Sequence, residues 1–137
     1  MARLARVTEA PLDLAEHLAA VDDPTCGAVV TFVGRVRDHD PEATGTVIAV
    51  EYSAHPDAGR MLGELADRAE AAGALVSVSH RVGALQVGEI ALLACVATAH
   101  RAEAYAVSRG LVEEIKASLP VWKRQVEADG ATRWIGA

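Results

Sequence analysis

The 137-residue sequence predicts an α+β protein in which a mixed, largely antiparallel sheet packs with about three helices. Segments with the periodicity of strands and of helices alternate in the order βαββαββαββ. Several neighbouring strands are separated only by short turns, which favours hairpins over a doubly wound parallel sheet. The nucleotide-binding fingerprints G-x-G-x-x-G and G-x-x-x-x-G-K-[ST] do not occur.

The composition predicts one acidic domain over residues 1–137. Hydrophobic residues make up 51% of the chain and aromatic residues only 4%, so the core should consist mainly of Ala, Val and Leu. The net charge of −6 argues against a nucleic-acid-binding protein, which normally carries a basic face. Neither a membrane span nor a signal peptide is predicted, and we expect a cytoplasmic protein.

The cysteines and histidines do not indicate a thiol or metal site. Cys95 lies in an apolar run that favours a buried, reduced thiol, and Cys26 lies far from it in sequence. Neither has a neighbouring His or Lys that would activate it. The five histidines never form an H-x-x-x-H pattern, so no zinc site is expected.

A short strand over residues 3–7 and a helix are predicted near the N-terminus. Pro11 is expected to open the helix. His17 also falls on this helix, where we expect a surface position. The apolar stripe of the helix should consist of Leu14, Leu18 and Val21.

The strongest predicted strand covers residues 27–37, G-A-V-V-T-F-V-G-R-V-R. Its density of β-branched residues favours a strand covered on both faces, and Gly34 predicts a bulge. The strand ends in Arg35 and Arg37, which lie on the same face of an extended chain. A polar and mobile loop over 38–45 should join it, as a long hairpin, to a strand over 46–52.

The second half of the chain follows the same periodicities. Pro120 excludes a continuous helix through Lys123, so a strand should follow it. Asp129-Gly130 is a hairpin signal that leads into a last short strand. On a mostly apolar face, His80 is expected to be a hydrogen-bonded core residue. The expected elements are a helix over 56–72, a strand over 75–82, a turn over 83–88, a strand over 90–99, a helix over 102–119 and a strand over 121–127.

The only two lysines, Lys116 and Lys123, lie on either side of Pro120, whereas the other 11 basic residues are arginines. A guanidinium stays charged, but a desolvated lysine can lose its proton and act as a nucleophile or base. This contrast motivates the hypothesis that the two lysines do chemistry that arginine could not. The alternative is a pair of solvated surface lysines.

Basic side chains also follow two predicted strands. Arg35 and Arg37 end one strand, His100 and Arg101 follow another, and Arg124 comes directly after the second lysine. If these segments converge, they form a small cationic pocket that can bind phosphate on an otherwise acidic protein. The alternative is a set of scattered surface salt bridges.

Five segments together resemble one known family. They are V-T-F-V-G-R-V-R, V-E-Y, H-R-V-G-A-L-Q-V-G-E, A-H-R-A-E-A-Y and I-K-A-S-L-P-V-W-K-R. In this order and spacing they resemble the large, catalytic subunit of molybdopterin synthase, from about Arg6 to Trp134. The resemblance implies an α/β-hammerhead fold and a homodimer. It also implies a heterotetramer, in which each protomer binds a small ubiquitin-like subunit.

The activity that the resemblance implies is sulfur transfer. The small subunit threads a Gly-Gly tail ending in a thiocarboxylate into the active site. Two transfers convert cyclic pyranopterin monophosphate into the dithiolene of molybdopterin, and no permanently bound cofactor or metal is implied. Because the sulfur arrives on the partner, the chain needs no catalytic cysteine.

The resemblance also assigns roles to individual residues. Lys116 matches the catalytic lysine that meets the tail, and Lys123 matches a second essential lysine that transfers protons or anchors a ligand. Gln125 stands where family members commonly have Glu, so the resemblance gives this position no proton-transfer role. The residues that match substrate-holding positions, or lie in the same segments, are Arg35, Arg37, His100, Arg101, Lys116, Lys123 and Arg124.

Two other functions fit the same residues. One is a regulatory module that binds a phosphate or nucleotide in the basic pocket without chemistry. The other is a scaffold that only docks a ubiquitin-like partner. Both predict binding without sulfur loss from the tail, and the module should tolerate exchange of lysine for arginine.

Overall fold

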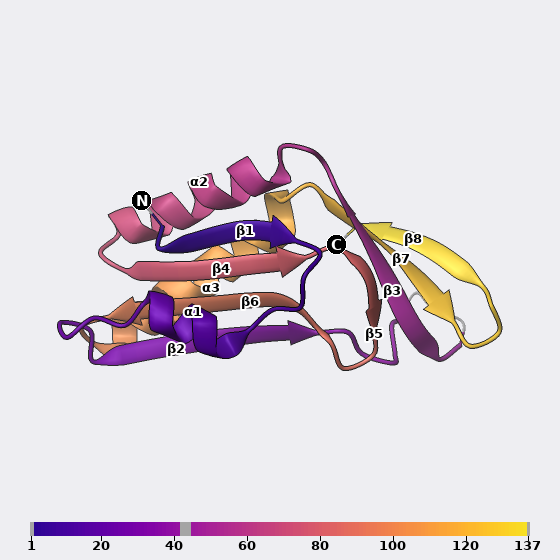
Figure 1. Ribbon diagram of the computed structural model, residues 1–137, viewed down its shortest axis with the longest axis horizontal. Helices are drawn as coiled ribbons and strands as arrows, with labels where there is room; N and C mark the ends of the chain where they lie inside the picture. Colours follow the sequence, from indigo (N-terminus) through magenta and orange to yellow (C-terminus); the bar gives the residue numbers. More distant parts are fainter. Residues whose placement is uncertain (1, 42–44, 137) are drawn as a thin grey trace.

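The computed structural model describes residues 2–41 and 45–136 and contains two four-stranded sheets (Figure 1). The first sheet has the strand order β1-β4-β6-β2. β1 and β4 run parallel, whereas β6 pairs antiparallel with both β4 and β2. The strands of this sheet are β1 (Leu4–Thr8), β4 (Leu75–Arg81), β6 (Ile90–Thr98) and β2 (Ala28–Arg35).

Three helices pack on the two faces of the first sheet, in agreement with the predicted fold class (Figure 1). Side chains of β4 alternate between the two faces of this sheet, and each face is covered by different helices. Val76 and Val78 belong to the main core beneath α2 and α3, whereas Ser77 and Ser79 lie on the opposite face, under α1. The helices are α1 (Leu14–Ala20), α2 (Ala58–Ala71) and α3 (Arg101–Ser118).

The second sheet is antiparallel throughout and has the order β5-β3-β7-β8. Its strands are β5 (Gly83–Gln86), β3 (Val47–Ala54), β7 (Val121–Glu127) and β8 (Thr132–Gly136). The turn between β7 and β8 contains Gly130 at φ 87°, a left-handed conformation that favours glycine, and it confirms the predicted hairpin. A second, smaller core joins this sheet to the first one. It consists of Val47, Val50 and Leu85 of the second sheet together with Ala91 of β6 and Val36, which follows β2.

The predicted hairpin between the strands over 27–37 and 46–52 is wrong. β2 pairs with β6, whereas β3 pairs with β5 and β7, so the connection passes from one sheet to the other. β2 is also an edge strand rather than one covered on both faces, with Val29 46% and Val33 39% exposed. The predicted bulge is confirmed, because the register with β6 shifts between Gly34 and Arg35.

The predicted turn over 83–88 is also wrong, since its first four residues form β5. Two glycines at positive φ, Gly83 and Gly88, bound this short segment and made it resemble a turn in sequence. Ladder pairing with β3, which is distant in sequence, makes it a strand. Local turn chemistry does not reveal such a partner.

The expected surface position of His17 is wrong as well. Its side chain is fully buried, whereas Leu14 and Leu18 are each 40% exposed. The ring of His17 forms hydrogen bonds with the carbonyl of Asp13 and the hydroxyl of Ser79, at 2.6 and 2.7 Å. α1 therefore packs against the serines of β4 with a polar residue, His17. The i, i+4 spacing of Leu14 and Leu18 pointed to the wrong face of this helix as the buried one.

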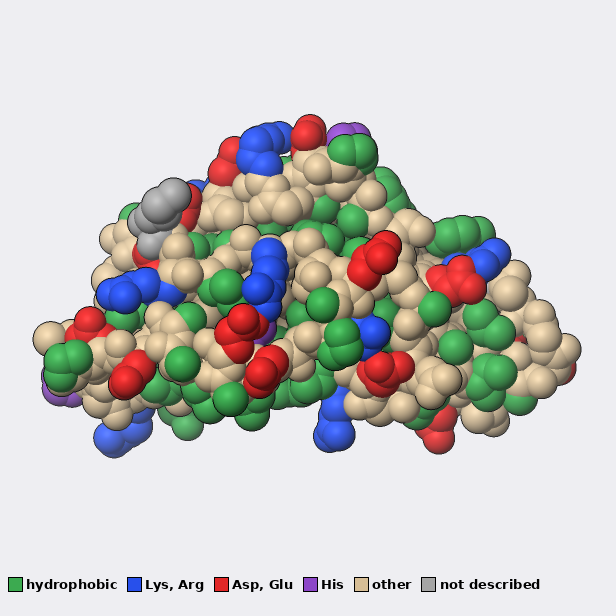
Figure 2. Space-filling model, viewed as in Figure 1, with side chains coloured by type: hydrophobic (Ala, Val, Ile, Leu, Met, Phe, Trp, Pro, Cys, Tyr) green, Lys and Arg blue, Asp and Glu red, His purple; other side chains and the backbone are tan. Residues whose placement is uncertain are grey.

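The described helices include none that is long and apolar enough to cross a membrane. On the face seen in Figure 2, acidic and basic side chains are interspersed. Part of the loop predicted to be mobile, residues 42–44, lies outside the described residues.

Candidate active site

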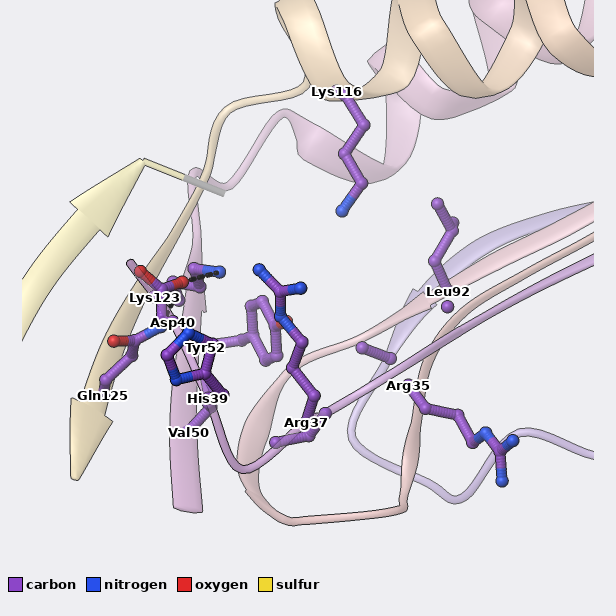
Figure 3. A pocket seen from close by; sticks show the side chains of 13 residues that line it. Arg35, Arg37, His39, Asp40, Val50, Tyr52, Leu92, Lys116, Lys123 and Gln125 are labelled. Carbon is purple, nitrogen blue, oxygen red and sulfur yellow. Dashed lines mark hydrogen bonds and ion pairs between the residues drawn. The ribbon is translucent and has the colours of Figure 1, made fainter. Parts of the chain in front are cut away.

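A pocket of about 120 Å³ opens where the end of β2, the end of α3 and the start of β7 meet (Figure 3). It collects basic, polar and apolar side chains from segments that are far apart in sequence. The lining residues are Gly34, Arg35, Val36, Arg37, His39, Asp40, Val50, Tyr52, Ala91, Leu92, Lys116, Lys123 and Gln125.

Lys116 occupies the last turn of α3, and its ammonium points into the pocket toward Arg37 (Figure 3). Leu119 leaves the helical conformation at ψ 125°, which directs the chain into β7. Lys116 is an exposed residue, but partial desolvation lowers the pKa of its ammonium, and the positive charge of Lys123 lowers this pKa further. Lys116 can therefore release its proton more readily than a solvated lysine.

Lys123 lies on β7, directly opposite Tyr52 of β3. Its Nζ atom is 3.7 Å from Oδ2 of Asp40, and the same oxygen accepts a hydrogen bond of 2.8 Å from Nε2 of Gln125. Gln125 is buried, and its Oε1 atom has no hydrogen-bond partner among the described residues. The two lysines predicted to act together thus share one pocket, but only Lys123 forms an ion pair with a carboxylate of the described chain.

Arg35, the last residue of β2, and Arg37, two residues later, have side chains with different orientations. In Figure 3 the guanidinium of Arg37 points toward Lys116, whereas that of Arg35 points away from the lysines. The expectation that they share one face fails because β2 bulges at Arg35 and ends there. Of the two, Arg37 is the one placed to meet an anion beside both lysines.

Arg124 is not part of this pocket. Its neighbours in the strand face the pocket, so alternation places Arg124 on the opposite face of β7. There it forms an ion pair with Glu51 and lies 5.5 Å from the ring centroid of Trp134.

His100 and Arg101 lie outside the pocket as well. Both are exposed at the start of α3, with His100 as its N-cap residue. The rise of an α-helix separates Arg101 from Lys116 by about 22 Å. The structure therefore does not bring all the expected basic groups together within one protomer.

Two aromatic side chains support the base of the pocket. Tyr52 lines it and packs edge-on against His80, with ring centroids 5.2 Å apart. Nδ1 of His80 donates a hydrogen bond of 2.8 Å to the carbonyl of Arg81, which confirms the predicted core histidine. Burial, together with the smaller effect of the positive charge of Lys116, lowers the pKa of His80 to about 4, so this imidazole is neutral near pH 7. Burial also raises the pKa of Tyr52.

Sequence reasoning missed Asp40 and Tyr52 as pocket residues. Tyr52 carried no usable signal, because its position opposite Lys123 depends on the pairing of β3 with β7, which local sequence does not reveal. Asp40 carried no such signal, since a polar loop does not indicate which of its residues reaches a distant strand.

Comparisons with known proteins agree on one family. The family model described as MoaE protein matches residues 7–118. The chain is 39% identical to molybdopterin synthase catalytic subunit 1 of Mycobacterium tuberculosis over 136 residues, covering 96% of this chain and 89% of that protein. The crystal structure of molybdopterin synthase from Staphylococcus aureus matches with a TM-score of 0.89 and 29% identity, covering 100% of this chain and 99% of the other.

A more distant structure shares the fold. It is a complex of subunits 1 and 2 of the molybdopterin-converting factor from Helicobacter pylori. The match has a TM-score of 0.76 at 21% identity and covers 99% of this chain and 90% of the other.

Proposed function

This chain belongs to the MoaE protein family, and we propose that it is the catalytic subunit of a molybdopterin synthase. It transfers sulfur from the thiocarboxylated tail of a small ubiquitin-like subunit to cyclic pyranopterin monophosphate, and the product is the dithiolene of molybdopterin. The observation that carries this proposal is the position of Lys116. Its desolvated ammonium points into a pocket that also contains Arg37 and Lys123.

The charges of the pocket suit two anionic reactants. A thiocarboxylate and a cyclic phosphate are both negative, and bringing them together requires fixed positive charge. The planar guanidinium of Arg37 can bind two phosphate oxygens, and Lys123 on β7 supplies a second positive charge. The pocket thus lowers the repulsion between tail and substrate while it excludes part of the water around them.

Lys116 is the group that meets the tail. Because its pKa is lowered, it can donate and recover a proton near neutral pH with less cost than an ordinary lysine. Each transfer leaves the sulfur on a carbon of the substrate and the tail as an ordinary carboxylate, whose new oxygen comes from substrate or water. A second small subunit with a thiocarboxylated tail then repeats the step.

A homodimer would explain the distant position of His100 and Arg101. β2 is an edge strand, and its Ala28 end lies beside Thr98, just before His100, whereas its Arg35 end lies at the pocket. A two-fold contact that runs antiparallel along this edge would bring the start of one α3 toward the pocket of the other protomer. In this arrangement each site takes its lysines from one protomer and its His-Arg pair from the next.

The remaining parts of the proposal follow from family membership. The working assembly is a heterotetramer of two copies of this chain and two small subunits, acting in the cytoplasm. The substrate and product are cyclic pyranopterin monophosphate and molybdopterin, with no permanently bound cofactor.

The direct test is reconstitution. The purified chain is mixed with a thiocarboxylated small subunit and cyclic pyranopterin monophosphate, and dithiolene formation and sulfur loss from the tail are measured. Sulfur transfer supports the proposal. Binding of both reactants without sulfur loss would instead indicate a regulatory module or a docking scaffold.

A further inference from the structure

Asp40 brings a carboxylate to the pocket from a segment outside both sheets. It lies in the connection between β2 and β3, and only 13% of its side chain is exposed. Its Oδ2 atom contacts both Nε2 of Gln125 and Nζ of Lys123 (Figure 3). Among the described residues that line the pocket, it is the only acidic one.

From this geometry we propose that Asp40 is a positioning residue for Lys123. Gln125 orients the carboxylate of Asp40, and the carboxylate keeps Lys123 charged and fixed in place. This arrangement leaves Lys116 as the amine that exchanges protons. The inference rests on the proposed function and assigns different roles to the two lysines: Lys123 is a fixed positive charge, and Lys116 exchanges protons.

The amide of Gln125 supports this assignment. A carboxylate accepts hydrogen bonds, so Gln125 must present its NH₂ group to Asp40. The amide oxygen is then buried without a partner among the described residues, which is an unfavourable position for a polar atom. The contact with Asp40 therefore fixes the orientation of the amide. A glutamate at position 125 would instead place a second negative charge beside Asp40.

The charges around Lys123 make its counter-ion important. Lys116 from α3 and Arg37 from the segment after β2 line the same pocket and oppose a positive charge on Lys123. His39 from that segment and Tyr52 from β3 also line the pocket. Without Asp40, no described lining residue would place a carboxylate beside the two ammonium groups and the guanidinium of Arg37, and the repulsion among these positive charges would be uncompensated.

The scarcity of lysine makes the proposal directly measurable. Lys116 and Lys123 are the only lysines, so trace labelling with acetic anhydride followed by mass spectrometry reports on each amine separately. The midpoint of labelling rate against pH depends on protonation rather than on access of the reagent. In the unmodified chain at pH 8, Lys123 should be labelled more slowly than Lys116, because Lys123 is the amine that contacts Asp40. The reverse order would overturn the proposal without any variant.

Variants then test whether the carboxylate of Asp40 causes the slow labelling of Lys123. Asp40→Asn should increase labelling of Lys123 at pH 8 about fivefold, the effect of losing an ion pair worth about 1 kcal/mol. Asp40→Glu should retain most of the protection. The double variant Asp40→Asn with Gln125→Glu returns a carboxylate to the site from β7 and should restore slow labelling. Asp38→Asn, in the same segment but outside the pocket lining, is the matched control and should change nothing.

Two results would contradict the role of Asp40. One is unchanged labelling of Lys123 in a folded Asp40→Asn variant, and the other is an equal increase in Asp38→Asn. A single-turnover assay adds the functional arm, because Asp40→Asn should shift the high-pH decline of sulfur transfer to lower pH. Labelling needs no sulfur donor, so an unmodified chain that protects Lys123 but transfers no sulfur would refute the proposed function alone.

Discussion

Arg101 and Lys116 lie at opposite ends of α3, about 22 Å apart along the helix. The first belongs to the His-Arg pair that resembles a substrate-holding segment, and the second points into the cationic pocket. A substrate of pterin size cannot contact both within one protomer. If both act on it, the active site is shared between two copies of the chain.

A shared site predicts complementation between inactive variants. His100→Ala and Lys116→Ala should each be inactive alone, but mixing and reassembling them in equal amounts should restore about a quarter of the normal activity. Half of the dimers are then mixed, and each mixed dimer has one intact site. The assay is sulfur transfer after co-refolding or co-expression. If the mixture stays inactive although mixed dimers are present, each site draws its residues from a single chain.

The orientation of the arginines predicts unequal effects on substrate affinity. Arg37→Ala should raise the KM for the cyclic phosphate about 10- to 100-fold, because a charge-assisted contact is lost. Arg124→Ala should change KM less than about threefold, since its guanidinium faces Glu51 and Trp134 on the other side of β7. Steady-state kinetics of both variants test this. Equal losses would mean that the pocket extends around β7.

His80 predicts a loss of stability in acid. Its pKa is about 4 when folded but about 6.5 when unfolded, so the unfolded chain binds more protons between these values. The free energy of unfolding should therefore fall as pH decreases from 6.5 to 4, by up to about 3 kcal/mol.

Denaturant unfolding at several pH values measures this effect. His80→Gln should show a flatter decline than the unmodified chain over the same range. His39→Gln, an exposed histidine, is the control and should follow the unmodified chain. An identical pH dependence in all three proteins would show that carboxylates alone cause the acid sensitivity.

The elements that local sequence determines were predicted well. α2 and α3, the break at Pro120, the bulge near Gly34 and the Asp129-Gly130 hairpin follow from periodicity and turn chemistry. Pairing between distant segments was not predictable in this way. The strand partners of β2 and β3 depend on which sheet each segment joins, and β5 is a strand only because β3 lies beside it.

The candidate site shows the same division. The abundance of arginine against two lysines identified Lys116 and Lys123, and the structure places both at one pocket. The predicted helix over 102–119 already separates His100 from Lys116, as α3 does in the structure. The sequence could not show that Asp40 approaches β7 from the connection between the sheets, because that contact depends on the packing of elements that are remote in sequence.

The most direct test of the account is the charge-preserving substitution Lys116→Arg, assayed with a thiocarboxylated small subunit and cyclic pyranopterin monophosphate. A guanidinium keeps the positive charge but does not release its proton, so dithiolene formation should fall at least about 100-fold while substrate still binds. Lys116→Ala should be equally inactive, with both variants folded by circular dichroism. Dithiolene formation at the normal rate by Lys116→Arg would contradict a proton-exchanging amine at this position.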